Sequence, residues 1–210
     1  MNTVALVGGG GHALVVASIL ASFPDTRLAG YTDIEDRGPI EGAAYLGNDS
    51  ALMLLRERVP GVTLALGMGH LGETGPRVSL VEWLTDQGFG FRSVVSAQAS
   101  VARTVLIAAG VVVMAGAVIN ARATIGPYAI ANSNSVIEHG ASIGAHVHVA
   151  PGAIICGDCH VGDGCLIGAG AVIAQGIEIP AHCLIGAGAV VTNSLRQSGT
   201  YIGCPARRSS

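Results

Sequence analysis

The chain has 210 residues, a formal net charge of −3 at pH 7, 31 glycines and only 4% aromatic residues. That length allows one or two domains, and the weak acidic balance gives no reason to expect a nucleic-acid or anionic membrane partner. Few aromatics and many small aliphatic residues favour a repetitive β architecture over an ordinary globular core. No basic leader and no uninterrupted apolar stretch of membrane-spanning length is present, so we expect a cytoplasmic protein.

The first 92 residues alternate between short buried strands and helices with apolar residues at helical spacing. Strands are predicted at 3–8, 27–33 and 62–67, and helices at 12–22, 50–59 and 76–88. This order predicts a small parallel sheet covered by helices, a Rossmann-like α/β domain over residues 1–92.

A glycine-rich turn follows the first predicted strand. It contains G-x-G-x-x-A at Gly8, Gly10 and Ala13, directly before a helix whose N-terminus favours phosphate. Asp33 ends the second strand, where an acid commonly meets a ribose or base. NAD domains share this pattern, but three strands leave no room for a second mononucleotide half, which argues against NAD.

From Val95 onward the sequence divides into seventeen units of six residues. The first residue is Ile or Val in sixteen units, with Ala131 as the exception, and the fifth is small or aliphatic throughout. Such a period predicts a parallel β-helix in which three units close one coil and positions 18 apart stack. We expect it over residues 93–196, with a C-terminal tail at 197–210.

Three histidines and a glutamate stand close together in NSNSVIEHGASIGAHVH, at Glu138, His139, His146 and His148. A metal site, a catalytic base and ordinary surface histidines are the competing interpretations. Zinc in trimeric hexapeptide proteins of the carbonic anhydrase type needs three converging histidines, and this spacing does not match that arrangement. An outer-turn imidazole can accept a proton near neutral pH, so His139 is a candidate general base.

The five cysteines are expected to be free thiols in a reducing compartment. Cys156 and Cys159 form a C-x-x-C that could indicate zinc or redox chemistry, but no second such motif is present. We therefore expect no metal.

Three segments resemble a known family: GGGGH at 8–12, NSNSVIEH…IGAHVHV at 132–149, and GCPAR at 203–207. The arrangement resembles nucleotide-sugar acetyltransferases with left-handed hexapeptide coils, the subgroup of bacillosamine and perosamine N-acetyltransferases and sialic-acid O-acetyltransferases. The resemblance implies a homotrimer that uses acetyl-coenzyme A, held in the groove between neighbouring prisms. It also implies that the nucleotide-sugar binds across the α/β domain.

The same resemblance assigns roles within the histidine segment. His139 becomes the general base and His148 contacts the acetyl end of the cofactor, donating near the thioester oxygen, while His146 is expected to be a solvated corner residue. The family usually has an acid immediately after the base, where this chain has Gly140. Glu138 is a substitute on the other side, although it can have another role.

The remaining assignments come from the alignment of hexads and motifs. For the cofactor they are Gly157, Ala169, Ala187 and Arg207 or Arg208, and for the nucleotide-sugar Gly10, Gly11, His12, Asp33 and Gly67. The cofactor positions are equally well interpreted as plain turn residues and a frayed basic tail. In place of the Asp that often follows the third-strand glycine, this chain has the longer loop GMGHLGETGPR.

The prediction is an N-acetyltransferase that moves acetyl from coenzyme A to the amine of a UDP- or GDP-linked 4-amino-sugar, by direct transfer. Two alternatives remain: a sugar O-acetyltransferase of the sialic-acid type, and a non-catalytic β-helix that binds nucleotide-sugars. Gly140 favours the amine, because an alcohol depends more on the base and its orienting acid.

Overall fold

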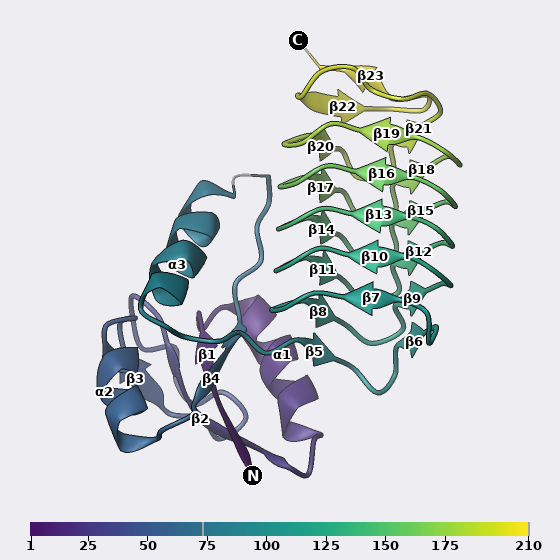
Figure 1. Ribbon diagram of the computed structural model, residues 1–210. Coiled ribbons are helices and arrows are strands. Elements are labelled where there is room, and N and C mark those ends of the chain that lie inside the picture. The colour runs from purple at the N-terminus through teal and green to yellow at the C-terminus, as the bar shows by residue number, and fades with distance from the viewer. Residues whose placement is uncertain (73, 210) are drawn as a thin grey trace. The chain divides into compact units, whose positions relative to one another are not determined.

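A computed structural model describes residues 1–72 and 74–209 (Figure 1). The chain divides into two compact units. The first contains Met1–Gly69 and Gly75–Val94, and the second contains His70–Thr74 and Val95–Ser210. The predicted boundary at residue 92 lies two residues before this division, but the assignment of the short segment 70–74 to the second unit has no counterpart in the sequence pattern.

The first unit contains a parallel sheet in the order β3-β2-β1-β4. Its strands are β1 (Asn2–Val7), β2 (Thr26–Thr32), β3 (Tyr45–Gly47) and β4 (Thr63–Leu66), and its helices are α1 (Gly11–Ala21), α2 (Ala51–Arg58) and α3 (Gly75–Asp86). The parallel α/β arrangement is confirmed, but the sheet has four strands and not the three expected. Strand β3 is only three residues long and lies at the edge beside β2, so it lacks the long apolar run that marks a buried strand.

The second unit is a three-sided prism built from the hexads, the left-handed parallel β-helix that the period predicts. One side, here called the apolar sheet, contains β6 (Ser100–Val101), β9 (Val118–Ile119), β12 (Val136–Ile137), β15 (Ile154–Ile155), β18 (Val172–Ile173) and β21 (Val190–Val191). A second side, the polar sheet, contains β7 (Leu106–Ile107), β10 (Thr124–Ile125), β13 (Ser142–Ile143), β16 (His160–Val161) and β19 (Glu178–Ile179).

The third side, the covered sheet, contains β5 (Val94–Val95), β8 (Val112–Val113), β11 (Ile130–Ala131), β14 (His148–Val149), β17 (Leu166–Ile167) and β20 (Leu184–Ile185). It continues into β22 (Thr200–Ile202) and the antiparallel β23 (Arg207–Arg208). Tyr201 of β22 is 8% exposed and belongs to the core. The expected C-terminal tail is therefore an ordered extension of the prism.

The register between neighbouring coils is 18 residues, as in Thr124↔Ser142 and Ile125↔Ile143. This pairing stacks the first and fifth hexad positions into the buried core, so Ala131 is 1% exposed despite being the exception to Ile and Val. Fourteen successive hexads, from Gly110 to Gly188, place their fourth residue at positive φ, which glycine adopts without strain. Glycine occupies eight of these fourteen positions, out of 31 glycines in the chain.

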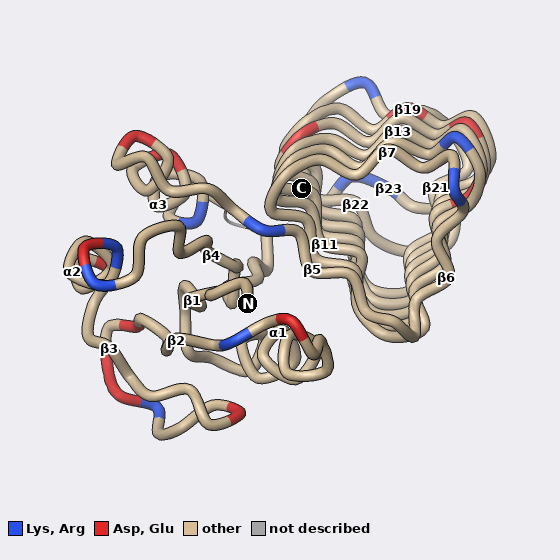
Figure 2. The backbone as a smooth tube through the Cα atoms, turned by 60° about the horizontal axis from the view of Figure 1, so that its bottom comes forward, with Lys and Arg blue, Asp and Glu red and all other residues tan. Residues whose placement is uncertain are grey.

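The outward residues of the three sheets differ in character. On the apolar sheet they are Ser100, Val118, Val136, Ile154, Val172 and Val190, and Figure 2 shows no charged residue along these strands. On the polar sheet Thr124, Ser142, His160 and Glu178 point outward. On the covered sheet the outward Val112, Ile130, His148 and Leu166 are buried. Gly72 lies near Leu184 there, and the carbonyl of His70 bonds to His148.

Candidate functional site

His139 lies on the corner where the apolar sheet passes into the polar sheet, between β12 and β13. It occupies the third hexad position, outside the aliphatic column, and its side chain is 50% exposed. The local sequence dictates this, because Ile137 and Ala141 on either side take the buried positions. The imidazole is therefore accessible to a ligand at the surface of the prism.

Gly157 lies against the ring of His139, in the same position of the next coil. A Cβ on Gly157 would stand 2.5 Å from His139 Cε1 and 2.7 Å from Nε2. Such distances are far inside van der Waals contact, so no other residue type fits while the ring keeps its place. The structure thus gives Gly157 a definite local function as the seat of the imidazole, while its predicted contact with a cofactor stays a prediction.

Asp158 provides the carboxylate nearest to the ring. Its Oδ1 lies 3.9 Å from His139 Nδ1, and its backbone N–H donates to the carbonyl oxygen of His139 at 2.9 Å. Glu138 is used differently, because its Oε2 accepts from the backbone N–H of His139 at 3.2 Å. Sequence reasoning missed Asp158, although the 18-residue stacking places it directly above Gly140.

His148 is buried on the covered sheet, with both ring nitrogens in hydrogen bonds. Its Nδ1 lies 2.9 Å from the carbonyl oxygen of His70 and must donate, because a carbonyl can only accept. Nε2 then accepts from the Asn132 amide at 3.0 Å, an orientation fixed by Asn132 Oδ1 accepting the N–H of Ser133. The one ring N–H of His148 is committed to His70, so donation to a thioester stays a prediction that requires this bond to be exchanged.

His146 is half-buried and stacks on Tyr128, with ring centroids 4.9 Å apart. Its carbonyl oxygen lies 2.9 Å from His70 Nε2, which donates to it. The expected solvated corner residue is thus part of a packed corner that also holds His70.

Ala169 and Ala187 lie on the corner where the covered sheet passes into the apolar sheet, one coil apart and both exposed. Among the residues that the structure describes, their backbone N–H groups donate to no protein acceptor. Their neighbours Gly170 and Gly188 have open space where a Cβ would be. This corner therefore offers donors for the amide carbonyls of an extended ligand such as pantetheine.

The two corners are separated by the apolar sheet, so the chain does not bring all predicted cofactor residues together on one side of the prism. Arg207 lies on β23 and is exposed, with its Nη1 donating to the carbonyl of Ala206. Arg208 Nη1 donates to Gln197 Oε1 at 3.3 Å. Neither arginine is frayed, and contact with cofactor phosphates stays a prediction for both.

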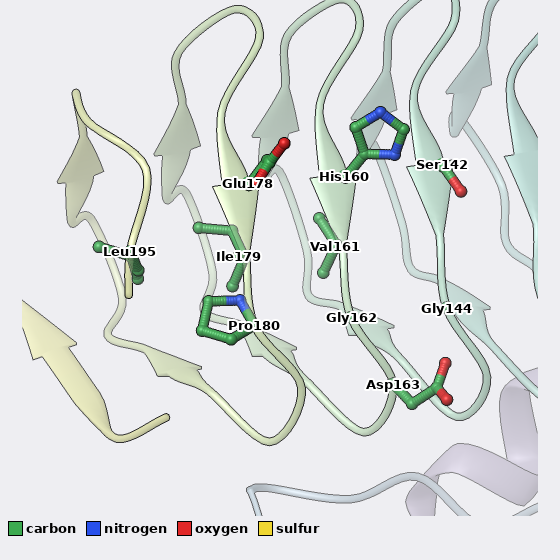
Figure 3. A pocket seen from close by; sticks show the side chains of 10 residues that line it. All are labelled: Ser142, Gly144, His160, Val161, Gly162, Asp163, Glu178, Ile179, Pro180 and Leu195. Carbon is green, nitrogen blue, oxygen red and sulfur yellow. The ribbon is translucent and has the colours of Figure 1, made fainter. Parts of the chain in front are cut away.

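A hollow of about 420 Å³ lies on the polar sheet, lined by side chains that include Ser142, His160, Asp163 and Glu178 (Figure 3). His139 does not line it; Ser142 at its edge follows His139 by three residues. Ser142, His160 and Glu178 lie side by side along it, but within the described residues no hydrogen bond joins their side chains, so we place the candidate chemistry at the His139 corner.

In the first unit, the predicted nucleotide-sugar residues gather where parallel strands end. Gly10 is the exposed N-cap of α1, and Gly11 and His12 are the first two residues of that helix. A Cβ on Gly67, after β4, would stand 2.8 Å from the Cβ of Ala13. This is the switch point between β1 and β4, where ligands bind in open α/β sheets.

Asp33 joins the same group from the end of β2. Its Oδ2 accepts the N–H of Gly9 at 2.7 Å and its Oδ1 accepts the N–H of Ile34 at 2.7 Å. Arg37 lies 3.8 Å from the same carboxylate. The acid therefore fixes the glycine turn beside the end of the second strand.

Within residues 1–72 and 74–209, no group of three or more His, Cys, Asp or Glu side chains is placed to hold a metal ion. Over the same part of the chain, no helix combines the length and the apolar character needed to cross a membrane. The five cysteines are free; Cys159 is buried in the core and Cys156 is half-buried.

Two family profiles match the chain: "PglD N-terminal domain" over residues 3–71 and "Bacterial transferase hexapeptide (six repeats)" over residues 158–193. Among curated proteins, UDP-N-acetylbacillosamine N-acetyltransferase of Bacillus subtilis is 35% identical over 116 residues, 54% of this chain and 52% of the relative. The chain thus spans about half the length of the curated relative that it matches.

Solved structures match over the whole chain. Perosamine N-acetyltransferase from Caulobacter crescentus, in complex with CoA and GDP-perosamine, is 34% identical with a TM-score of 0.92, over 100% of this chain and 98% of that one. The acetyltransferase domain of PglB from Neisseria gonorrhoeae, in complex with acetyl coenzyme A, is 26% identical with a TM-score of 0.87 over the full length of both.

The α/β unit, the hexapeptide prism and an exposed histidine on its corner define a protein of the hexapeptide-repeat acyltransferase class. More narrowly, the chain belongs to the family of nucleotide-sugar N-acetyltransferases that includes the bacillosamine and perosamine enzymes.

Proposed function

We propose that this protein transfers acetyl from acetyl-coenzyme A to the amine of a nucleotide-linked amino sugar, with His139 as general base. The observation that carries the proposal is the half-exposed imidazole held over Gly157 on an outer corner of the prism. The relatives support the substrate class, since both the Bacillus and the Caulobacter proteins are N-acetyltransferases of sugar nucleotides. Structures of the Caulobacter protein with one histidine replaced contain CoA and GDP-perosamine, so these ligands bind there without that histidine.

The step is a direct transfer. The amine nitrogen attacks the thioester carbonyl while His139 takes a proton from it. The C–N bond forms, the C–S bond breaks, and the proton passes to the departing coenzyme A sulfur. No protein nucleophile is required, and alignment of the two substrates supplies much of the acceleration.

The site fits acetyl-coenzyme A at the level of the backbone. Unpaired N–H groups at Ala169 and Ala187, on a corner without bulky side chains, suit the amide carbonyls of pantetheine. Acetyl-coenzyme A supplies the activated acyl group there. Because these residues and His139 border opposite edges of the apolar sheet, a groove between two copies would bring one corner of each prism to the same ligand.

The proposal includes a homotrimer. The outward Val136, Ile154 and Val172 of the apolar sheet form an uncharged stripe, and Ile154 is 37% exposed in the single chain. Monomeric proteins rarely leave such contiguous apolar surface in water. A second copy against this sheet would bury it and create the groove.

The preference for an amine over a hydroxyl now depends on the relatives. Gly140 alone no longer favours the amine, because Asp158 provides an acid beside His139. The decisive measurement is release of free coenzyme A with UDP- and GDP-4-amino-sugars, together with the stability of the product to mild alkali. An amide survives alkali and an ester does not, and a rate unchanged in His139→Ala would eliminate the proposed base.

A further inference from the structure

Gly140, the residue after His139 in the turn, has no side chain, and a residue of the next coil fills the space. Gly140 and Asp158 occupy the fourth position of stacked hexads, both at positive φ. A Cβ built on Gly140 would collide with Asp158 Oδ1. The carboxylate of Asp158 therefore reaches into the level of the coil below, beside the imidazole.

We propose that Asp158 is the positioning carboxylate of His139, delivered from the adjacent coil into the place that Gly140 leaves open. The inference rests on the proposed role of His139 as base. It adds a residue that acts through the imidazole and does not itself contact substrate.

Backbone geometry holds the pair together. The N–H of Asp158 donates to the carbonyl of His139 at 2.9 Å, so the two turns cannot drift apart without breaking the ladder. His139 Nδ1 and Asp158 Oδ1 are 3.9 Å apart, and rotation of these two short side chains brings them to hydrogen-bond distance. A carboxylate on the Nδ1 side favours the tautomer with hydrogen on Nδ1, which leaves the Nε2 lone pair for the proton of the amine.

The other charged groups at this corner do not replace Asp158. Glu138 directs its carboxylate to the backbone N–H of His139. Arg122 lies at the same corner of the coil below, where a cation disfavours the imidazolium. Asp158 is thus the group that stabilises the protonated ring as it forms.

The arrangement predicts that the positioning carboxylate can be attached to residue 140 in place of residue 158. Six non-glycine residues already occupy the fourth hexad position at positive φ in this prism, Asp158 among them, so an aspartate at position 140 is tolerated once residue 158 is small. The double variant Gly140→Asp/Asp158→Gly therefore fills the same space beside the imidazole with a carboxylate from residue 140.

The experiment measures kcat and the KM of both substrates in three variants. Asp158→Asn should reduce kcat about tenfold and leave both KM values within about twofold, because a positioning carboxylate acts on the proton transfer and not on substrate binding. The double variant should recover kcat to within about threefold of wild type, which a purely structural role of Asp158 would not allow.

Glu178→Gln, which removes an exposed carboxylate from the polar sheet two coils' distance along the prism, is the matched control and should not change kcat. A kcat of Asp158→Asn within about twofold of wild type overturns the inference, as does a double variant no better than Asp158→Asn. Failure of the proposed function looks different, because the wild-type protein itself would then release no coenzyme A.

Discussion

The imidazole of His139 lies over the backbone of Gly157, one coil further along the prism, with no space for a Cβ between them. The relationship joins the fold to the chemistry, because the 18-residue register that stacks two turns also selects which residue can support the ring. Most turns of the prism have a side chain at this hexad position. The turn at Gly157 has none, so its backbone offers a flat surface for the imidazole.

Gly157→Ala should therefore displace the ring. We expect kcat to fall about tenfold or more, because general base catalysis depends on the placement of the proton acceptor. Gly157 does not have positive φ, so an alanine is not strained at the backbone, and the melting temperature should change little. Steady-state kinetics and thermal unfolding measure the two effects.

Gly90→Ala is the control, since its Cβ would meet nothing within 4 Å and its φ is also not positive. It should leave both kcat and melting temperature close to wild type. A Gly157→Ala protein with kcat within twofold of wild type would show that the ring is not held by this seat.

His148→Ala tests whether the buried histidine acts mainly in structure. The substitution leaves the carbonyl of His70 and the amide of Asn132 without their partner in a buried place. We expect the free energy of unfolding to drop by about 2–4 kcal/mol in urea titrations. His160→Ala removes an exposed histidine from the polar sheet and should cost less than about 0.5 kcal/mol.

The two possible roles of His148 separate in this comparison. If kcat falls in His148→Ala while stability equals that of His160→Ala, the ring serves the acetyl end as the family resemblance implies. If the free energy of unfolding of His148→Ala instead falls clearly below that of His160→Ala, the main role of His148 is to hold the chain around His70 on the covered sheet.

Much of the prism was predictable because its information is local. Each hexad specifies its own strand and turn, and the first and fifth positions are buried throughout the core. Strand β3 was not predictable, since its three residues gain their place from pairing with β2 and not from their own pattern. The segment 70–74 could not be placed either, because its partners are more than 70 residues away.

The site divides in the same way. The outer hexad position of His139 predicts its exposure at a corner of the prism, and the adjoining sequence indicates Glu138 as the neighbouring acid, whereas the carboxylate beside the ring in the structure is that of Asp158. The 18-residue period stacks residue 158 on residue 140, and Gly140 has no side chain to fill the space between them. Applying the register to side chains, and not only to the core, would have identified Asp158.

Ile154→Arg should disrupt the proposed assembly. Ile154 is the most exposed of the aliphatic residues on the outer face of the apolar sheet, and it stacks between Val136 and Val172. A buried unpaired guanidinium costs several kcal/mol at an interface, so sedimentation should report monomers at micromolar concentration. Leu106→Arg, at the equivalent hexad position of the polar sheet and 69% exposed, should leave the trimer intact. A trimeric Ile154→Arg protein would place the interface elsewhere.

Asp33→Ala should loosen the glycine turn of the first unit. The substitution removes the acceptor for the N–H of Gly9, which lies in the turn that precedes α1, and the acceptor for the N–H of Ile34 at the end of β2. We expect the Kd of the nucleotide-sugar to rise about tenfold, from the lost charged hydrogen bonds, with acetyl-coenzyme A binding unchanged. Calorimetry with each ligand separates the two. Asp25→Ala, at the opposite end of β2, should leave both affinities at wild-type values. Equal affinities for Asp33→Ala and wild type would contradict a role of Asp33 in nucleotide-sugar binding, whether by direct contact or through the glycine turn.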